Sequence, residues 1–413
     1  MLIFRHISAT QGQDFMKFAY FVRPHIGGTY SVFKQLRAGL AEKDVDVHWM
    51  SIDSPGSVHD DQWLPEFSYG SLVQVHGGMT ERDQAETLVQ ALEDGGFDGI
   101  FINVLSERIL TNIARYLPEK FLRIMIVHNI TAGTYSAAKA IRNHVHATIG
   151  VSERIRSDLV RKLDFPAHRT FVIPHAAGSS STRDIRREAN MSDILRLIFL
   201  GRIEDASKGV FWLPEILSHL PQTVHLTVAG DGPDLGNLKD KLSPHLHRVT
   251  FLGAVHPEKV HNLLLQHDVL IMPSRYEGFG LTITEAMSAG CIPVVSRIRG
   301  VTDTIIDDGT NGFLFPIGNS REAAQIVAQI HSNAETAQWL SDAAQCKADA
   351  TFTLEIMAER YLNVIRNVKA DPINIAAPLR MEEWAMPRGL RSGLRTLVPR
   401  PLKNWLRVVR ERI

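Results

Sequence analysis

The stretch PSRYEGFGLTITEAMSAGCIPVVS, residues 273–296, decides the fold of this 413-residue chain. Short apolar runs typical of buried strands flank it at 269–272 and 292–295, and a helical pattern begins near 284–287. In a strand–loop–helix–strand unit of a parallel sheet, the loop lies at the carboxyl ends of the strands, where α/β proteins bind ligands. The sequence therefore predicts an α/β domain with a ligand site in this loop.

The loop carries two carboxylates, Glu277 and Glu285, eight positions apart. Gly278 and Gly280 have no side chain, so a ligand can approach the backbone closely. The free N–H groups at the start of the following helix favour a phosphate. One carboxylate before the turn and one inside the helix can each bind a pair of sugar-like hydroxyl groups.

The order E-G-F-G-L-x3-E-A-M-x-x-G-x-P-V-V resembles the E-x7-E motif of retaining, nucleotide-sugar-dependent glycosyltransferases of family 4, the glycosyl transferases group 1. The resemblance implies the GT-B fold, an α/β architecture in which two Rossmann-like, doubly wound parallel-sheet domains face an interdomain cleft. It also implies that Glu277 holds the hydroxyls of the donor sugar and that Glu285 binds the ribose. The backbone N–H groups expected to contact the donor are those of Phe279, Gly280, Leu281 and Thr282.

A second motif is FLGRIEDASKG, residues 199–209, in which Arg202 and Lys208 follow a predicted strand. Two cations in such a loop can neutralise a nucleoside diphosphate and stabilise it as a leaving group. The resembling family has G-R-x(n)-K-G here, with the diphosphate as the partner. This chain has two additional residues in the loop, Ala206 and Ser207.

Three further features are interpreted through the same resemblance. VAGDGPDLGNL, residues 228–238, is similar to the family's G-x-G-P loop beside the nucleotide base, which makes Gly230 and Gly232 donor-binding candidates. Gly27 and Gly28 precede a helical pattern and permit close approach of a phosphate or acceptor, although a plain tight turn is the alternative. His128 ends a strand in IMIVHNIT and resembles the histidine that reaches the donor sugar; a satisfied polar side chain is the alternative.

The chain departs from the family pattern at two places. It has Ile173-Pro174-His175-Ala176 where I-P-N-G is common, and 299–303, RGVTD, where the family has G-G-x-x-E. These changes affect contacts with the acceptor or donor rather than the class of reaction.

No metal or cofactor is expected. Asp44-Val45-Asp46 spells D-x-D, but it begins a strand in which Val45, Val47 and Trp49 alternate inward, so we interpret it as structural. Arg202 and Lys208 already supply the positive charge that a divalent cation would bring.

The length fits two α/β domains. The strand pattern MKFAYFV begins at Met16, so residues 1–15 are predicted to be a poorly ordered extension, an added edge strand being the alternative, and the start at Met1 or Met16 stays open. The small, polar stretch AAGSSSTRDIRREANMSD contains the linker. The expected units are an extension at 1–15, an acceptor-side domain at 16–178, a linker at 179–193, a nucleotide-sugar-binding domain at 194–370 and a basic tail at 371–413.

Composition is that of a globular protein, with 44% hydrophobic and 22% charged residues. No apolar run reaches the ~18 residues that span a bilayer, and the start lacks the apolar core of a secretory signal. The two cysteines, Cys291 and Cys346, are too few for a disulfide framework and are expected to be buried small hydrophobes. These features favour a cytoplasmic protein.

The zero net charge hides a basic tail: residues 388–413 contain eight Arg or Lys against one acid, Glu411. One predicted helical face carries the apolar residues Leu402, Trp405, Leu406, Val409 and Ile413, and cations occupy the other. Such a helix suits an anionic membrane surface on the inner face of the cytoplasmic membrane. Packing on the protein or on a partner subunit is the equal alternative. No nucleic-acid reading module is recognisable, so we expect no nucleic-acid partner.

The function predicted from these features is transfer of a sugar from a UDP- or GDP-linked donor to a glycan or lipid-linked acceptor, with retention of anomeric configuration. Surface polysaccharide or glycolipid synthesis is the context that the resemblance implies. The alternatives are a sugar-nucleotide epimerase of the same fold and a nucleotide-sugar-binding protein without turnover. No residue presents itself as a nucleophile, which favours front-face transfer.

Overall fold

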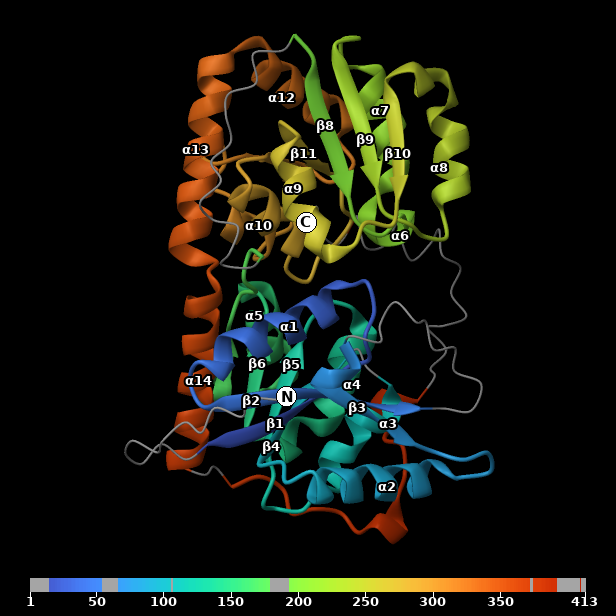
Figure 1. The fold of residues 1–413 in the computed structure, drawn as a ribbon, viewed down its shortest axis with the longest axis vertical. Coiled ribbons are helices and arrows are strands. Elements are labelled where there is room, and N and C mark those ends of the chain that lie inside the picture. Colours follow the sequence, from blue (N-terminus) through green and yellow to red (C-terminus); the bar gives the residue numbers. More distant parts are fainter. Residues whose placement is uncertain are drawn as a thin grey trace, which may run out of the picture.

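The computed structural model describes residues 15–53, 66–104, 107–178, 193–371, 374–391 and 409. They form two α/β units, one above the other in Figure 1, each built on a parallel sheet. The predicted extension at 1–15 falls almost wholly outside the described residues. So do the predicted linker, apart from its last residue, and most of the basic tail.

The first unit has a seven-stranded sheet in the order β3-β2-β1-β4-β5-β6-β7. Every pairing in it is parallel, and the order reverses beside β1, as in doubly wound folds. Helices cover both faces, which is why the central strands β4 and β5 are almost entirely buried. Its strands are β1 Met16–Phe21, β2 Val45–Asp53, β3 Gly70–Gln74, β4 Gly99–Asn103, β5 Leu122–Val127, β6 Ala147–Gly150 and β7 Thr170–Val172. Its helices are α1 Gly28–Ala41, α2 Glu81–Asp94, α3 Arg108–Asn112, α4 Ala132–Ile141 and α5 Glu153–Leu163.

The second unit has a six-stranded parallel sheet in the order β10-β9-β8-β11-β12-β13. Here too the order reverses, at β8, which pairs with both β9 and β11. Its strands are β8 Leu195–Leu200, β9 Val224–Ala229, β10 Val249–Gly253, β11 Val269–Met272, β12 Ile292–Ser296 and β13 Phe313–Phe315. Its helices are α6 Asp205–Lys208, α7 Leu213–Ser218, α8 Leu235–Leu242, α9 Pro257–Leu265, α10 Leu281–Ser288, α11 Thr302–Ile305, α12 Ser320–Ser332 and α13 Ala334–Thr351.

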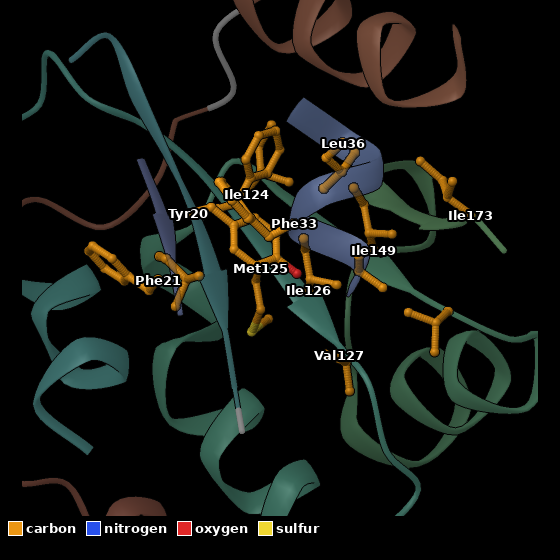
Figure 2. Packing of buried hydrophobic residues seen from close by; sticks show 14 of the residues in the cluster. Tyr20, Phe21, Phe33, Leu36, Ile124, Met125, Ile126, Val127, Ile149 and Ile173 are labelled. Atoms are coloured by element: carbon orange, nitrogen blue, oxygen red, sulfur yellow. The ribbon is translucent and has the colours of Figure 1, made fainter. Parts of the chain in front are cut away.

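The core of the first unit lies between α1 and the sheet. Figure 2 shows Phe33 and Leu36 of α1 against Ile126 and Ile149 of the sheet, with Tyr20 of β1 among them. All five are 2% exposed or less. The 3.6-residue spacing of the apolar positions of α1 produces this continuous buried face.

The last helix, α14 Leu354–Ala370, returns from the second unit to the first, along one side of the molecule (Figure 1). Its N-cap Thr353 accepts from the backbone N–H of Ile356 at 3.1 Å. Its buried residues, among them Tyr361 and Ile365, belong to the core of the first unit, against α1. The closing helix therefore packs on the first unit.

Residues 374–391 form a strap across the first unit, a feature that the sequence interpretation treated only as tail. Trp384 packs on Tyr116 at 4.6 Å between ring centroids, and Tyr116 Oη accepts from the backbone N–H of Ala385 at 2.9 Å. Leu390 is buried, next to α4. The strap therefore places the start of the basic stretch, residues 388–391, beside α4.

Other expectations have mixed outcomes. Cys291 is buried, but Cys346 is exposed on α13, so the expectation that both are buried is wrong for Cys346. Asp46 bonds His48 at 2.6 Å and Arg37 at 3.1 Å, while Val45, Val47 and Trp49 are fully buried, as expected of a structural D-x-D. Within the described residues, no helix is both long and apolar enough to cross a bilayer.

Candidate active site

Lys208 and Glu277 form an ion pair at the edge of the second sheet that faces the first unit. Lys208 Nζ lies 2.6 Å from Glu277 Oε1, and Ser274 Oγ donates to the same oxygen at 2.7 Å. Glu277 is 8% exposed. Gly209, at φ +61°, makes the approach of the two loops possible, because a Cβ there would lie 2.1 Å from the carbonyl oxygen of Pro273. The fold thus brings together one predicted cation and one predicted carboxylate.

Arg275 anchors the Lys208 loop from the opposite side. Its guanidinium donates to Asp205 Oδ2 and to the Asp205 carbonyl, both at 2.8 Å, and lies 3.9 Å from the ring of Trp212. Its backbone N–H donates to the carbonyl of Ser207 at 2.8 Å. Ser207 is one of the two residues by which this loop is longer than the motif, so the additional length provides the anchoring carbonyl.

Glu285 lies one helical turn into α10 and is half-buried. Burial raises its pKa to about 7. Among the described residues, no hydrogen bond or ion pair of its side chain is seen, so the carboxylate is available to a ligand. Glu277 and Glu285 are therefore in different states: the first is bonded to a cation, whereas the second is paired with none of the described cations.

The start of α10 presents free backbone donors beside these carboxylates. Gly280 is the N-cap, at φ +105°, and Phe279 lies just before it. The helix begins at Leu281, three residues earlier than the pattern indicated, so Leu281 and Thr282 form its first turn. Their N–H groups have no acceptor within the helix.

Gly230 and Gly232 allow two loops of the second unit to pack closely against each other. A Cβ on Gly230 would lie 1.9 Å from the carbonyl oxygen of Gly201, and one on Gly232 would lie 2.3 Å from that of Ile203. The N–H of Ile203 donates to Asp231 at 2.8 Å. The glycines therefore let the 228–238 loop pack on the loop that carries Arg202. Arg202 itself is exposed, with no side-chain partner in the described part of the chain.

His128 lies at the carboxyl end of β5 in the first unit, and Asn103 at the end of β4 orients it. Asn103 Nδ2 donates to the carbonyl of Phe21 at 2.8 Å, which directs Asn103 Oδ1 toward His128 Nε2, also at 2.8 Å. His128 Nε2 is therefore assigned as the protonated nitrogen, because an oxygen faces it. Burial lowers the pKa of His128 to about 4, so the ring is neutral at pH 7 and Nδ1 remains an acceptor.

The two units meet at this histidine. A Cβ on Gly278 would lie 1.8 Å from the carbonyl oxygen of His128, so the absent side chain makes room for the backbone of the other unit. The sequence interpretation assigned the bare backbone of Gly278 to ligand approach, which stays a prediction, and did not foresee this packing role. His175 stacks on His128 at 5.5 Å and meets Phe279 edge-on at 5.2 Å between centroids.

The first unit also has a cavity of about 240 Å³ at the edge of its sheet where Asn103 and His128 lie. Arg23, His25, Asn103 and Glu107 are among its lining residues. Gly28 begins α1 beside it, and a Cβ there would meet nothing within 4 Å. A Cβ on Gly27 would lie 2.6 Å from the His25 ring, so Gly27 accommodates this side chain.

Sequence reasoning missed Ser274, Asn103, Asp205 and Arg275, and it noted His175 only as a departure from a motif. Ser274 and Arg275 lie inside the quoted stretch, so their position was a usable signal. Asn103 ends a predicted strand at the ligand-binding edge, which is a weaker signal. The assignments of Arg202, Lys208, Glu277 and His128 as catalytic stay predictions.

Residues 195–333 match the family described as glycosyl transferases group 1. The chain is 24% identical over 301 residues to the alpha-D-kanosaminyltransferase of Streptomyces kanamyceticus, covering 68% of this chain and 77% of that protein. Several other curated relatives are matched over only 35% to 58% of their own length.

Solved structures resemble the whole arrangement. S. aureus TarM, in a complex with fondaparinux, alpha-GlcNAc-glycerol and UDP, has a TM-score of 0.71 at 12% identity, covering 84% of this chain and 99% of that chain. Anabaena HepE, in complex with UDP-glucose, has a TM-score of 0.70 at 17% identity, covering 86% of this chain and 100% of that chain. At these identities the likeness shows the fold. The chain has the GT-B fold, and together these findings support a glycosyltransferase whose group 1 domain spans residues 195–333.

Proposed function

We propose that this protein is a retaining glycosyltransferase of family 4 that transfers a sugar from a UDP- or GDP-linked donor to a glycan or lipid-linked acceptor in surface polysaccharide or glycolipid synthesis. The observation that carries the proposal is the Lys208–Glu277 pair, 2.6 Å apart and bonded by Ser274, with the half-buried Glu285 eight residues further along the same loop and helix. Cations and carboxylates placed together at the carboxyl edge of a parallel sheet suit a ligand that has both phosphates and hydroxyls.

In this proposal the second unit holds the donor. Glu285 accepts the ribose hydroxyls, and Glu277 accepts those of the sugar through Oε2, because the bonds from Lys208 and Ser274 engage Oε1. Arg202 and Lys208 contact the diphosphate, and the N–H groups at the start of α10 add donors. His128 Nδ1 accepts from a hydroxyl of the same sugar.

The reaction proposed is front-face transfer. The bond between the anomeric carbon and the diphosphate oxygen breaks while the acceptor oxygen bonds to the same face of that carbon. The acceptor's proton passes to the departing phosphate oxygen, so the diphosphate serves as the base. Lys208 and Arg202 stabilise the charge that develops on the diphosphate. The acceptor lies on the first unit, at the cavity near Arg23 and Asn103, and closure of the two units aligns both substrates.

The comparisons support this proposal. The relative named above is a kanosaminyltransferase, and both structural neighbours were solved with UDP or UDP-glucose. Neither the epimerase nor the non-catalytic alternative finds support among these names.

The test combines binding with turnover. Calorimetry with a panel of nucleoside diphosphates identifies the base, and the matching sugar nucleotides are then assayed. We expect Lys208→Ala and Glu277→Ala each to lower kcat at least ~10²-fold, the scale of one lost transition-state contact. Arg321→Ala, an exposed substitution on α12, is the control. Near-normal turnover in both site variants would reject the site, and a product of inverted anomeric configuration would reject front-face transfer.

We propose that the reaction needs no divalent cation. Asp46 of the D-x-D sequence bonds Arg37 of α1 and His48 of β2. Among the described residues, no group of three or more His, Cys, Asp or Glu side chains is arranged to hold a metal ion. Activity that survives chelator agrees with this view; activity abolished by chelator and restored by Mg²⁺ contradicts it.

We further propose that the protein is cytoplasmic and docks on an anionic inner-membrane surface through residues 388–413. The strap supports this proposal because it leads the chain to α4 at residues 388–391, on the acceptor side of the molecule. Vesicle sedimentation tests it. We expect salt-sensitive binding to vesicles containing phosphatidylglycerol, lost when residues 392–413 are deleted. Equal binding by the shortened chain would favour packing of the tail on protein.

A further inference from the structure

A basic groove lies between α5 of the first unit and the turn at Arg299–Gly300 of the second. Its volume is about 520 Å³, roughly twice that of the first-unit cavity. Arg154 holds the two sides together: its backbone N–H donates to the carbonyl of Gly300 at 2.8 Å, and its guanidinium to the carbonyl of Arg299 at 3.1 Å. A ligand in this groove would therefore contact both units.

Only some of the cations in the groove are used internally. Asp158 accepts from Lys162 at 2.5 Å, from Arg154 at 2.9 Å and from Tyr135 at 3.0 Å. Burial alone would raise the pKa of Asp158, but these bonds outweigh burial and lower it, so the carboxylate is ionised and fully occupied.

The remaining cations are available to a ligand. Arg161 and Arg299 are exposed, and no partner of either guanidinium occurs among the described residues. The Nε–H group of Arg156 donates to the carbonyl of Thr170 at 2.9 Å, which orients the guanidinium. This bond leaves the two terminal nitrogens for a ligand. Counting Glu153 and Asp158 against five cations, the lining has three uncompensated positive charges. Planar guanidinium groups bind phosphate oxygens in pairs, so such a lining suits a phosphoryl group.

The groove is separate from the proposed diphosphate site. Arg202 follows β8 and Gly230 follows β9, whereas Arg299 follows β12, on the other side of β11 in the sheet order. Arg299 also stands where the resembling family has a glycine, in the G-G-x-x-E loop. The charge at this turn is thus a property of this chain, and the donor site does not account for it.

We propose that this groove binds a phosphate- or diphosphate-bearing group through Arg156, Arg161 and Arg299. The assignment of that group to the acceptor rests on the proposed function. The shared chemistry is a phosphoryl group, and its source is either a water-soluble phosphorylated molecule or the headgroup of a lipid. Because the ligand would bridge both units, it would favour their closed arrangement.

The test uses the full chain and inorganic pyrophosphate as the probe. Calorimetry compares wild type with the double variant Arg161→Gln/Arg299→Gln and with the control Arg321→Gln/Arg360→Gln, which removes two exposed arginines elsewhere. We expect at least about tenfold weaker pyrophosphate binding in the groove variant alone, the scale of losing charged hydrogen bonds. The difference should persist when the donor site is saturated with nucleoside diphosphate. Matching melting temperatures show that the variants are folded.

Vesicles distinguish the two sources. Phosphatidylcholine vesicles with and without phosphatidylglycerol are sedimented with the same three proteins, all of which retain the tail. Weaker pyrophosphate binding with unchanged vesicle binding in the groove variant assigns a soluble phosphoryl group; weaker vesicle binding assigns a lipid headgroup. Equal pyrophosphate and vesicle binding by groove and control variants would overturn the proposal. Failure of every nucleoside diphosphate to bind would defeat the proposed function instead, and would leave this comparison of variants intact.

Discussion

The two halves of the candidate site are held in place in different ways. In the second unit, Lys208, Glu277 and Arg275 are bonded to one another's loops, all within one domain. In the first unit, His128 depends on Asn103 from a neighbouring strand, and its ring stacks on His175, which in turn meets Phe279 of the other unit. The second half is held by bonds within its own domain, whereas the first half also contacts the other unit, through His175 and Phe279.

This difference separates binding from catalysis. The nucleoside diphosphate part of the donor, which the second unit holds alone, should bind even when the units are displaced. Transfer additionally requires His128 and the acceptor to be correctly positioned relative to the donor. Changes at the contact between units should therefore lower kcat more than they weaken nucleotide binding, while changes within the second unit should affect both.

The largest effect is expected from Gly278→Ala. Its Cβ would lie 1.8 Å from the carbonyl oxygen of His128, and a backbone atom has little freedom to yield. Because a displacement of about 1 Å can cost ~10²-fold in rate, we expect kcat to fall by about that factor while nucleoside diphosphate affinity changes little. Steady-state kinetics and calorimetry measure the two effects.

Gly236→Ala is the matched control, because a Cβ on Gly236 of α8 would meet nothing within 4 Å. It should leave both quantities unchanged. An equal loss of kcat and of nucleotide affinity in Gly278→Ala would show that the second half is not independent of the contact.

A smaller effect is expected from Arg275→Lys, within the second unit. Lysine keeps the charge but loses the two-point grip on Asp205 and the planar contact with Trp212. We expect about tenfold losses in both kcat and nucleoside diphosphate affinity, because the Lys208 loop loses its anchor. Arg297→Lys is the control: Arg297 also pairs with an aspartate, Asp308, but both side chains are exposed and outside the site. A change in kcat alone would contradict the independence of the second half.

The same contrast explains what sequence could predict. The E-x7-E stretch and the Arg202–Lys208 loop carry their chemistry in contiguous residues, so both members of the Lys208–Glu277 pair were identified before the fold was known. The strands of both sheets were largely visible as apolar runs. By contrast, Asn103 and His128 are 25 residues apart, and only the parallel pairing of β4 with β5 brings them together.

Two features were hidden for a further physical reason. The strap at 374–391 has no apolar period of its own, and it is held by contacts with residues far away in the sequence, such as that of Trp384 with Tyr116 of the first unit. The packing role of Gly278 was missed because the close approach comes from the backbone of another domain, which no local pattern records.

Glu285, in the second half of the site, should make nucleotide binding depend on pH. Burial raises the pKa of Glu285 to about 7, so its ionised fraction rises about tenfold between pH 6 and pH 8. An ionised carboxylate accepts two ribose hydroxyls better than a carboxylic acid. We therefore expect nucleoside diphosphate affinity to rise severalfold over this range in wild type, as measured by calorimetry.

Glu285→Gln should flatten this dependence. The second ionisation of the ligand's own phosphate, near pH 6, is common to both proteins, so the difference between them isolates the carboxylate. Parallel pH profiles for wild type and variant would contradict the role of Glu285 in nucleotide binding.

The buried histidines of the first half, His128 and His175, should make the protein less stable in acid. Burial, followed by the proximity of His128, lowers the pKa of His175 well below its usual value, and burial lowers that of His128 to about 4. The unfolded chain therefore takes up protons near pH 6.5 that the folded chain refuses, so this contribution to stability is present above pH 6.5 and is lost as the pH falls toward 4. Each such histidine adds a slope of about 1 kcal/mol per pH unit.

His175→Asn, which restores the residue common in the family motif, should reduce the slope of unfolding free energy between pH 6.5 and 4.5 by about one histidine. Chemical denaturation at several pH values measures it. His144 and His146, whose pKa values burial also lowers to about 4, remain in both proteins and so cancel in the difference. Because His175 lies where the units meet, acidification below pH 6.5 should lower kcat further, after protonation of Glu285 near pH 7 has weakened nucleotide binding. An unchanged slope would show that the folded chain protonates this ring as readily as the unfolded chain does, for example because water enters the contact, and it would contradict the burial of His175 between the units.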